Sequence, residues 1–72
     1  MKKIYKMENL DCANCAAKME AAIAKIDGVN SCSISFMAQK LTIDLEEDKL
    51  QEIINQAQKA VKNIERHCSI LI

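Results

Sequence analysis

The spacing of apolar residues along the 72-residue chain switches repeatedly between period two and helical spacing, and the order of these switches limits the fold more than any other feature. Alternating patterns over residues 2–8 and 29–37 predict strands. Residues 41–45 alternate again after a short turn near Ala38 and Gln39, so this run and the one before it are predicted to form a hairpin. A fourth strand is predicted near the C-terminus from the alternating apolar residues Ile64, Cys68, Ile70 and Ile72.

Two amphipathic helices are predicted between these strands. The apolar positions of the first are Cys15, Met19, Ala22, Ile23 and Ile26. This helix is expected to end at Asp27-Gly28, because glycine adopts the left-handed conformation that terminates a helix. The apolar positions of the second are Leu50, Ile53, Ile54, Ala57 and Val61. Acidic residues at 46–48 suit the positive end of its helix dipole.

The predicted order of elements is therefore strand, helix, strand, strand, helix, strand. This order is the α+β, ferredoxin-like βαββαβ arrangement, a four-stranded antiparallel sheet with two helices on one face. The chain has no proline, one glycine, no repeat and no low-complexity linker, so residues 1–72 are predicted to form one domain. The fold alone does not define a function, because it carries many unrelated activities.

Charge and composition restrict the partners and the compartment. Ten Lys and Arg against ten Asp and Glu give no net charge, which argues against nucleic acid and against membrane contact by this segment. The N-terminus lacks the apolar stretch of an export signal, and no run approaches the ~18 apolar residues of a membrane span. The four cysteines are therefore expected to be free thiols in a reducing cytoplasm. The chain is expected to be a monomer.

Cys12 and Cys15 form a Cys-x-x-Cys motif within Leu10–Cys15, the only stretch where several chemically active side chains meet. Two thiols at this spacing can bind one soft or borderline metal ion, or they can form a disulfide. Cys12 falls in the predicted loop and Cys15 in the opening turn of the first helix, where unpaired backbone N–H groups favour thiolates. Both cysteines are therefore expected to deprotonate more easily than a free cysteine.

Asp11 precedes the cysteine pair and has two interpretations. As a ligand, its carboxylate would add a hard oxygen donor and a negative charge, which suits a divalent ion such as Zn²⁺ and is of little use to Cu(I). As a structural residue, it would only supply a negative charge or a cap at the N-terminus of the first helix. The two roles are compatible, and the sequence leaves both open.

The remaining Cys and His residues are not expected to join the motif. Cys32 and Cys68 each fall on the apolar face of a predicted strand, so both thiols are predicted to pack in the core. His67 points away from the face that carries Cys68. A four-ligand site with the Cys-x-x-Cys pair, or a four-cysteine iron–sulfur cluster, would require these residues to leave their strands.

The segments Met7–Lys18, Ile26–Val29 and Lys40–Ile43 together resemble a heavy-metal-associated domain. More narrowly, the chain is similar to the N-terminal domains of zinc-, cadmium- and lead-transporting P-type ATPases, in which an Asp commonly precedes the first Cys. The resemblance covers essentially the whole chain and agrees with the predicted order of elements.

This resemblance implies that Cys12 and Cys15 are metal ligands and that Asp11 is a third. Copper-handling relatives typically carry Thr or Ser at that position, so the residue favours the divalent ions. The resemblance also implies a cytoplasmic location, in a free-standing protein or in the cytosolic portion of a membrane protein. The implied partners are the metal ion and either other domains of a metal-transporting ATPase or a partner metal-binding domain.

Three further residues affect the interpretation of the motif. Asn9 stands where the family usually has glycine, and asparagine tolerates positive φ better than most residues, so the backbone can be preserved. Leu10 stands where methionine is frequent. Glu65, after the second helix, is predicted to be either a further oxygen ligand or a solvated carboxylate at a strand end.

The predicted function is binding and transfer of Zn²⁺, Cd²⁺ or Pb²⁺ through the Asp-Cys-x-x-Cys loop, without catalysis by the domain itself. A Cu(I) metallochaperone domain is the alternative, because thiolates bind Cu(I) very strongly. A dithiol oxidoreductase agrees less well, since thioredoxin-like enzymes use a cis-proline opposite their dithiol and this chain contains no proline. A regulatory interaction domain of the same fold would bind its partner regardless of metal.

Overall fold

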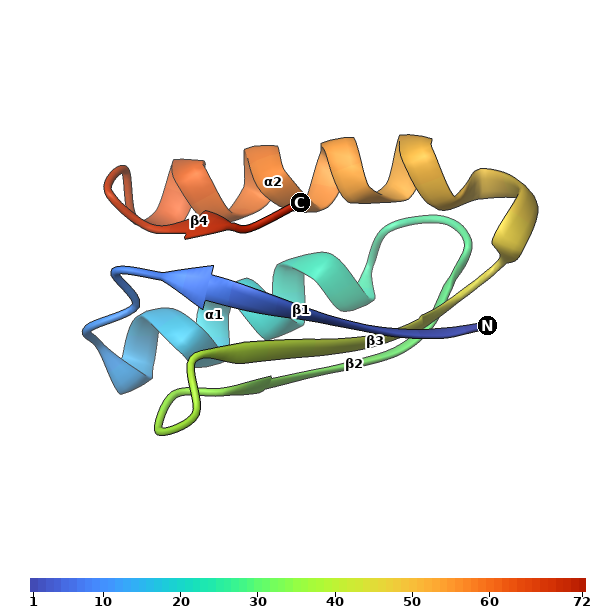
Figure 1. Cartoon of the computed structure of the whole chain (residues 1–72). Coiled ribbons are helices and arrows are strands. Elements are labelled where there is room, and N and C mark those ends of the chain that lie inside the picture. Colours follow the sequence, from blue (N-terminus) through green and yellow to red (C-terminus); the bar gives the residue numbers. More distant parts are fainter.

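Two helices cover one face of a four-stranded sheet in the computed structural model, which describes residues 1–72 (Figure 1). In chain order the elements are β1 (Lys2–Glu8), α1 (Ala13–Ala24), β2 (Val29–Ser35), β3 (Lys40–Leu45), the short 3-10 helix η1 (Glu47–Lys49), α2 (Leu50–Ile64) and β4 (Ser69–Ile70). The sheet order is β2-β3-β1-β4, and each neighbouring pair of strands is antiparallel. The predicted ferredoxin-like fold is confirmed.

The hydrophobic core lies between the sheet and the two helices. Alternate residues of a strand point to one face, and the fully buried residues of β3 are Leu41, Ile43 and Leu45. Residues three or four apart share one face of a helix, and the fully buried helical residues are Met19, Ile23, Ile53, Ala57 and Val61. No polar or charged residue is buried. Polar side chains that could form a site therefore lie at the surface of this core.

Helix α1 ends at Ala24, before the predicted stop at Gly28. The next two N–H groups bond to carbonyls three residues back, which tightens the last turn. Gly28 has the left-handed backbone that was expected (φ +98°), but it lies in the turn that leads into β2. A Cβ at this position would meet the Cδ1 of Ile53 at 2.7 Å. Glycine is needed here because the turn approaches α2 closely.

Strand β4 contains only Ser69 and Ile70, so the predicted fourth strand was too long. Ile64 belongs to α2, and residues 66–67 form a turn that interrupts the alternation. Cys68 and Ile70 are buried as the alternation predicted, whereas Ile72 is 68% exposed beyond the strand. The strand β2 likewise ends at Ser35, and the hairpin turn occupies residues 36–39.

Side chains from both helices complete the edges of the sheet. The Gln58 side chain in α2 donates a hydrogen bond to the Ile70 carbonyl and accepts one from the Ile70 N–H, both at 2.8 Å. At the opposite edge, the Glu20 carboxylate in α1 accepts a hydrogen bond from the Ile34 N–H of β2 at 2.9 Å. These contacts occupy backbone groups that would otherwise be open to pairing with another strand.

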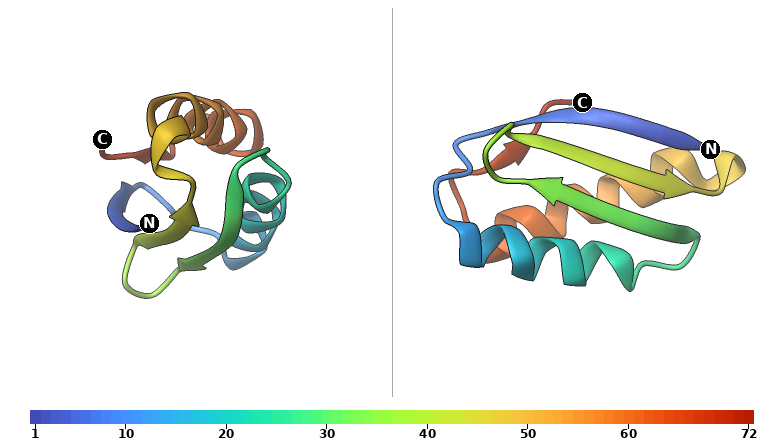
Figure 2. Two further views of the ribbon diagram at one scale, coloured as in Figure 1. Left: turned by 90° about the vertical axis from the view of Figure 1, so that its right-hand side faces the viewer. Right: turned by 90° about the horizontal axis from the view of Figure 1, so that it is seen from below.

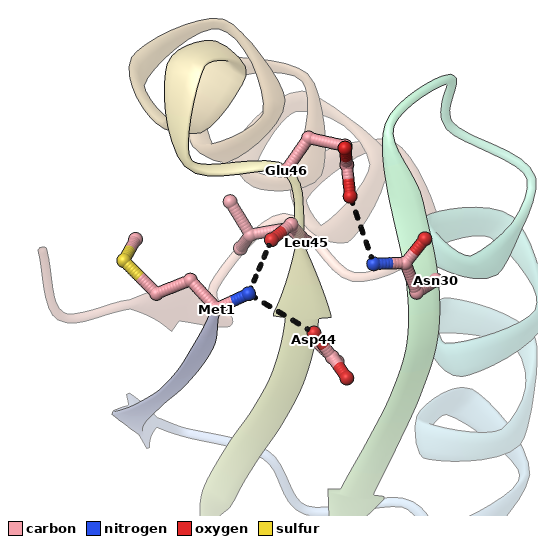
Figure 3. A network of polar contacts seen from close by, with 5 residues as sticks. All are labelled: Met1, Asn30, Asp44, Leu45 and Glu46. Atoms are coloured by element: carbon pink, nitrogen blue, oxygen red, sulfur yellow. Dashed lines mark hydrogen bonds and ion pairs between the residues drawn. The ribbon is translucent and has the colours of Figure 1, made fainter.

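Polar contacts around the end of β3 connect neighbouring strands at one end of the molecule (Figure 3). The N-terminal amine of Met1 donates to the Leu45 carbonyl at 2.9 Å and lies 3.3 Å from the Asp44 carboxylate. The Asn30 side chain donates to Glu46 at 3.1 Å. These contacts tie the starts of β1 and β2 to the end of β3.

Three connections meet at the other end of the molecule, where Figure 2 shows them together: the β1–α1 loop, the β2–β3 turn and the α2–β4 turn. Hydrogen bonds join Leu10 to Gln39 and Asn9 to His67. The loop that carries the Cys-x-x-Cys motif is thus in contact with both turns. None of the helices has the length and apolar content that crossing a membrane requires.

Candidate metal-binding site

Cys12 is the N-cap residue of α1 and has an extended backbone (φ −138°, ψ 121°). Its Sγ accepts a hydrogen bond from the Cys15 N–H at 3.4 Å, and its carbonyl accepts one from the Ala16 N–H at 3.0 Å. The thiol takes the capping role that an Asp or Ser side chain usually has. The start of the helix therefore keeps the two cysteines within one turn, with Cys12 in the loop and Cys15 in the helix, as predicted.

Asp11 is exposed and lies outside the helix, whose first turn contains no acidic residue. The interpretation of Asp11 as the helix cap is wrong, because the Cys12 thiol occupies the capping position. An exposed carboxylate can rotate about its side-chain bonds without disturbing the core. The role of Asp11 as a ligand therefore stays a prediction.

The two thiols of the motif differ in acidity. The pKa of Cys12 is lowered from its ordinary value because its sulfur accepts a hydrogen bond from the backbone N–H of Cys15, and the Asn14 N–H acts in the same direction. The pKa of Cys15 is raised, because its hydrogen bond with the Cys12 side chain, its burial and the charges of Cys12 and Glu65 all favour the thiol. The prediction of easier deprotonation is therefore right for Cys12 and wrong for Cys15.

Glu65 is the C-cap residue of α2 and lies beside Cys15. Its Oε2 is 3.9 Å from the Cys15 Sγ, and its Oε1 is 3.1 Å from the Nε2 of His67. The Glu65 side chain is 24% exposed, whereas the His67 side chain is 75% exposed. Glu65 therefore ends a helix and not a strand, and its carboxylate is only partly exposed, while its role as a further oxygen ligand stays a prediction.

Asn9 and Leu10 lead the chain into the motif. Asn9 has a φ of +61°, the conformation that the more usual glycine would supply, and its Nδ2 donates to the His67 carbonyl at 3.1 Å. Leu10 is 3% exposed, and the side chain of Gln39 contacts both its N–H and its carbonyl. The sequence carries no signal for the contacts of Gln39 and His67, because both depend on how distant turns meet.

Cys32 and Cys68 lie outside this group, as predicted. Cys68 is fully buried among core residues, and Cys32 packs half-buried against the core, where burial raises the pKa of its thiol to about 11. All four cysteines are free thiols. No three His, Cys, Asp or Glu side chains converge closely enough in the structure to hold an ion together. The structure thus brings Glu65 to Cys15 but does not gather Asp11 with the two thiols.

Residues 4–67 match the heavy-metal-associated domain family. The chain is a heavy-metal-associated domain. The cadmium, zinc and cobalt-transporting ATPase of Bacillus subtilis (strain 168) is 36% identical to it over 70 residues, which are 97% of this chain and 10% of that protein. The zinc/cadmium/lead-transporting P-type ATPase of Escherichia coli (strain K12) is 36% identical over 56 residues, 78% of this chain and 8% of that protein.

This heavy-metal-associated domain also shares its fold with the CopZ metallochaperone, at a TM-score of 0.77 and 20% identity over 99% of this chain and 100% of that one. The chain spans a tenth or less of the length of the two ATPases it resembles. Family membership confirms the predicted resemblance and identifies a non-catalytic, metal-binding module related to parts of heavy-metal ATPases.

Proposed function

We propose that this heavy-metal-associated domain, with residues 1–72 acting as one unit, binds a divalent ion (Zn²⁺, Cd²⁺ or Pb²⁺) through Cys12 and Cys15 and passes it on. The observation that carries the proposal is the Glu65 carboxylate, 3.9 Å from the Cys15 thiol. A mixed set of sulfur and oxygen donors suits Zn²⁺ and related borderline ions, whereas Cu(I) is satisfied by two sulfurs. The names of the two ATPases, which list cadmium and zinc, support the same group of ions.

Metal binding requires both thiols to lose their protons. Cys12 has the lowered pKa and supplies the first thiolate, which the backbone N–H groups of the helix N-terminus stabilise. Cys15 holds its proton more tightly and gives it up as the cation approaches. Glu65, the hydrogen-bond acceptor of that thiol, is then free to turn its oxygen toward the ion and serve as a third ligand.

Asp11 is proposed as a further oxygen ligand. It directly precedes Cys12, and its exposed side chain adds a negative charge beside the motif. That charge opposes ionisation of Cys12 in the metal-free domain, where it acts to raise the thiol pKa. A divalent cation reverses the sign of this interaction, since it attracts the carboxylate and both thiolates together.

Delivery of the ion, rather than permanent storage, agrees with the openness of the site. Both thiols are only half-buried, and the neighbouring residues Asp11, Ala13 and Asn14 are exposed. Ligands from a partner can therefore approach and take over the ion stepwise. The proposed partner is another domain of a metal-transporting P-type ATPase on the cytoplasmic side of a membrane, or a second metal-binding domain.

Anaerobic titration of the reduced domain with Zn²⁺ and Cd²⁺, in competition with a chromophoric chelator, tests the proposal. One ion per chain is expected, with binding lost in Cys12→Ser and Cys15→Ser. Cys32→Ser is the matched control, because its thiol lies outside the site and should leave affinity unchanged. Binding that survives both substitutions in the motif would contradict the assigned site.

The same samples distinguish the alternatives. X-ray absorption of the zinc-loaded domain should show two sulfur neighbours together with oxygen neighbours. If the wild-type domain binds no Zn²⁺ but binds Cu(I) through two sulfur ligands, the result would support the Cu(I) metallochaperone instead. Efficient reduction of insulin disulfides by the domain would support the dithiol oxidoreductase.

A further inference from the structure

The Gln39 side chain links the β2–β3 turn to the loop that carries the cysteines. Its Oε1 accepts a hydrogen bond from the Leu10 N–H at 3.0 Å, and its Nε2 donates to the Leu10 carbonyl. The same Nε2 donates to the Phe36 carbonyl of its own turn at 2.8 Å. One side-chain amide thus pairs with both backbone polar groups of the residue that lies two positions before Cys12.

The backbone of Gln39 is fixed as well. Its φ of +56° lies in the left-handed region, which is uncommon for a residue other than glycine. Its carbonyl accepts a hydrogen bond from the Met7 N–H at 2.8 Å, which ties the turn to the end of β1. Gln39 therefore contacts the chain on both sides of Asn9. A strained backbone that is kept at a site of convergent contacts points to a positional requirement.

Leu10 has few alternatives to this pairing. The residue is 3% exposed, so its N–H and carbonyl lie beside the core, where unpaired backbone groups are costly. On the other side of the loop, the Asn9 side chain donates to the His67 carbonyl at 3.1 Å. The approach to Cys12 is therefore held by two turns that lie 29 and 58 residues farther along the chain.

We propose that Gln39 is a positioning residue of the metal site, which holds the Leu10 backbone so that Cys12 stays at the helix N-cap beside Cys15. The inference rests on the proposed function of the loop. Ligands that are held in place before binding lose less conformational freedom when the ion arrives, so the complex is tighter. Gln39 thereby sets the affinity and the release rate of the ion without contacting it.

The variant Gln39→Asn shortens the side chain and keeps the left-handed backbone conformation. Asparagine tolerates a left-handed backbone, but it is one methylene too short to span Leu10 as glutamine does. The Zn²⁺ affinity of this variant should be about tenfold weaker, because the loop would then have to be ordered when the ion binds. Hydrogen exchange at the Leu10 amide of the metal-free domain should be faster in Gln39→Asn than in the wild type.

Two controls accompany this variant. Gln56→Asn makes the same substitution at an exposed position of α2 and should leave both measurements unchanged. Ile53→Val removes a methyl group from the core near Gly28, at the far end of the domain, and controls for a general loss of stability. Its Zn²⁺ affinity should match that of the wild type.

Each outcome separates the role of Gln39 from the proposed function. Either wild-type Zn²⁺ affinity or wild-type Leu10 exchange in Gln39→Asn would overturn the role of Gln39 and leave the proposed function intact. A similar loss of affinity in Ile53→Val would also overturn it, because stability would then explain the effect. Failure of the wild-type domain to bind Zn²⁺ would contradict the proposed function, and unchanged Leu10 exchange would still refute the positioning role.

Discussion

The Oε2 of Glu65 lies 3.9 Å from the Sγ of Cys15, although the two residues are 50 positions apart in the sequence. They meet because the first turn of α1 and the end of α2 lie at the same end of the molecule (Figure 1). In the metal-free domain the carboxylate helps to raise the pKa of the Cys15 thiol. Under the proposed function, the same negative charge would attract a divalent ion, so loss of the Cys15 proton and binding of the ion would be coupled at this pair of residues.

The first prediction concerns Glu65→Gln, which removes the charge and keeps the size of the side chain. Its Zn²⁺ and Cd²⁺ affinities should fall at least about tenfold, which corresponds to about 1.4 kcal/mol of binding free energy. Its Cu(I) affinity should change less, because two thiolates satisfy that ion. Chelator competition measures both, and Glu52→Gln, an exposed charge near the start of α2, is the control. Unchanged Zn²⁺ affinity would exclude Glu65 as a ligand.

The second prediction concerns Asp11→Ala. Because Asp11 does not cap α1, its loss should leave the stability of the metal-free domain nearly unchanged. Zn²⁺ binding should weaken more than Cu(I) binding, since only the divalent ion gains from an oxygen ligand. Asp48→Ala, which removes an exposed charge at the other end of the molecule, is the control. Equal losses for the two ions would place Asp11 outside the coordination sphere.

The third prediction concerns His67→Ala. The imidazole Nε2 lies 3.1 Å from the Glu65 Oε1, and the rest of the His67 side chain is largely exposed, so we expect the histidine to act by orienting this carboxylate. Removing a group that hydrogen-bonds to a metal ligand typically lowers metal affinity by about tenfold or more, so the Zn²⁺ affinity of His67→Ala should fall on this scale. Arg66→Ala, at the neighbouring exposed position, controls for altered charge in the turn.

A double variant gives the sharper test of His67. If the histidine acts through Glu65, His67→Ala should have little further effect on Zn²⁺ affinity in the Glu65→Gln background. Additive losses in the double variant would mean that His67 affects the ion by a separate route.

Residues with a regular pattern were predictable, and residues defined by long-range contacts were not. The alternation of Leu41, Ile43 and Leu45 indicated a buried strand face, and all three are fully buried. Ile64 satisfied an alternation over only a few residues, yet it continues the helical period of α2. A short alternating run near a helix end does not distinguish a strand from the last helical turn.

In the candidate site, too, local features were predictable and long-range contacts were not. The placement of Cys12 in the loop and of Cys15 in the helix followed from the local pattern, and the positive φ of Asn9 followed from the family resemblance; the structure agrees with both. The raised pKa of Cys15 was not predictable, because it depends on the direction of its hydrogen bond with Cys12 and on the approach of Glu65. The side-chain contacts of residues from distant turns require the assembled fold.

The fourth prediction concerns the order in which the thiols react. Alkylation follows the thiolate fraction. Because the pKa of Cys12 is lowered and that of Cys15 is raised, iodoacetamide should modify Cys12 at lower pH than Cys15. Cys32, with a pKa of about 11, should react only under more alkaline conditions. Peptide mass spectrometry across a pH series measures the order, and faster modification of Cys15 than of Cys12 would contradict the hydrogen-bond assignment.

The fifth prediction concerns the edge of the sheet rather than the metal site. The Gln58 side chain makes two hydrogen bonds of 2.8 Å to the N–H and carbonyl of Ile70, in a strand of two residues. Gln58→Ala leaves both groups without a protein partner, so the free energy of unfolding in urea should fall by about 1–3 kcal/mol. Gln56→Ala, at an exposed position of the same helix, should have almost no effect on stability.

Gln58→Ala also leaves the edge of the sheet open to pairing with another chain. This variant should therefore associate more than the wild type at high concentration, and light scattering measures the association. Equal stability and association in the two variants would show that Gln58 does not protect the edge.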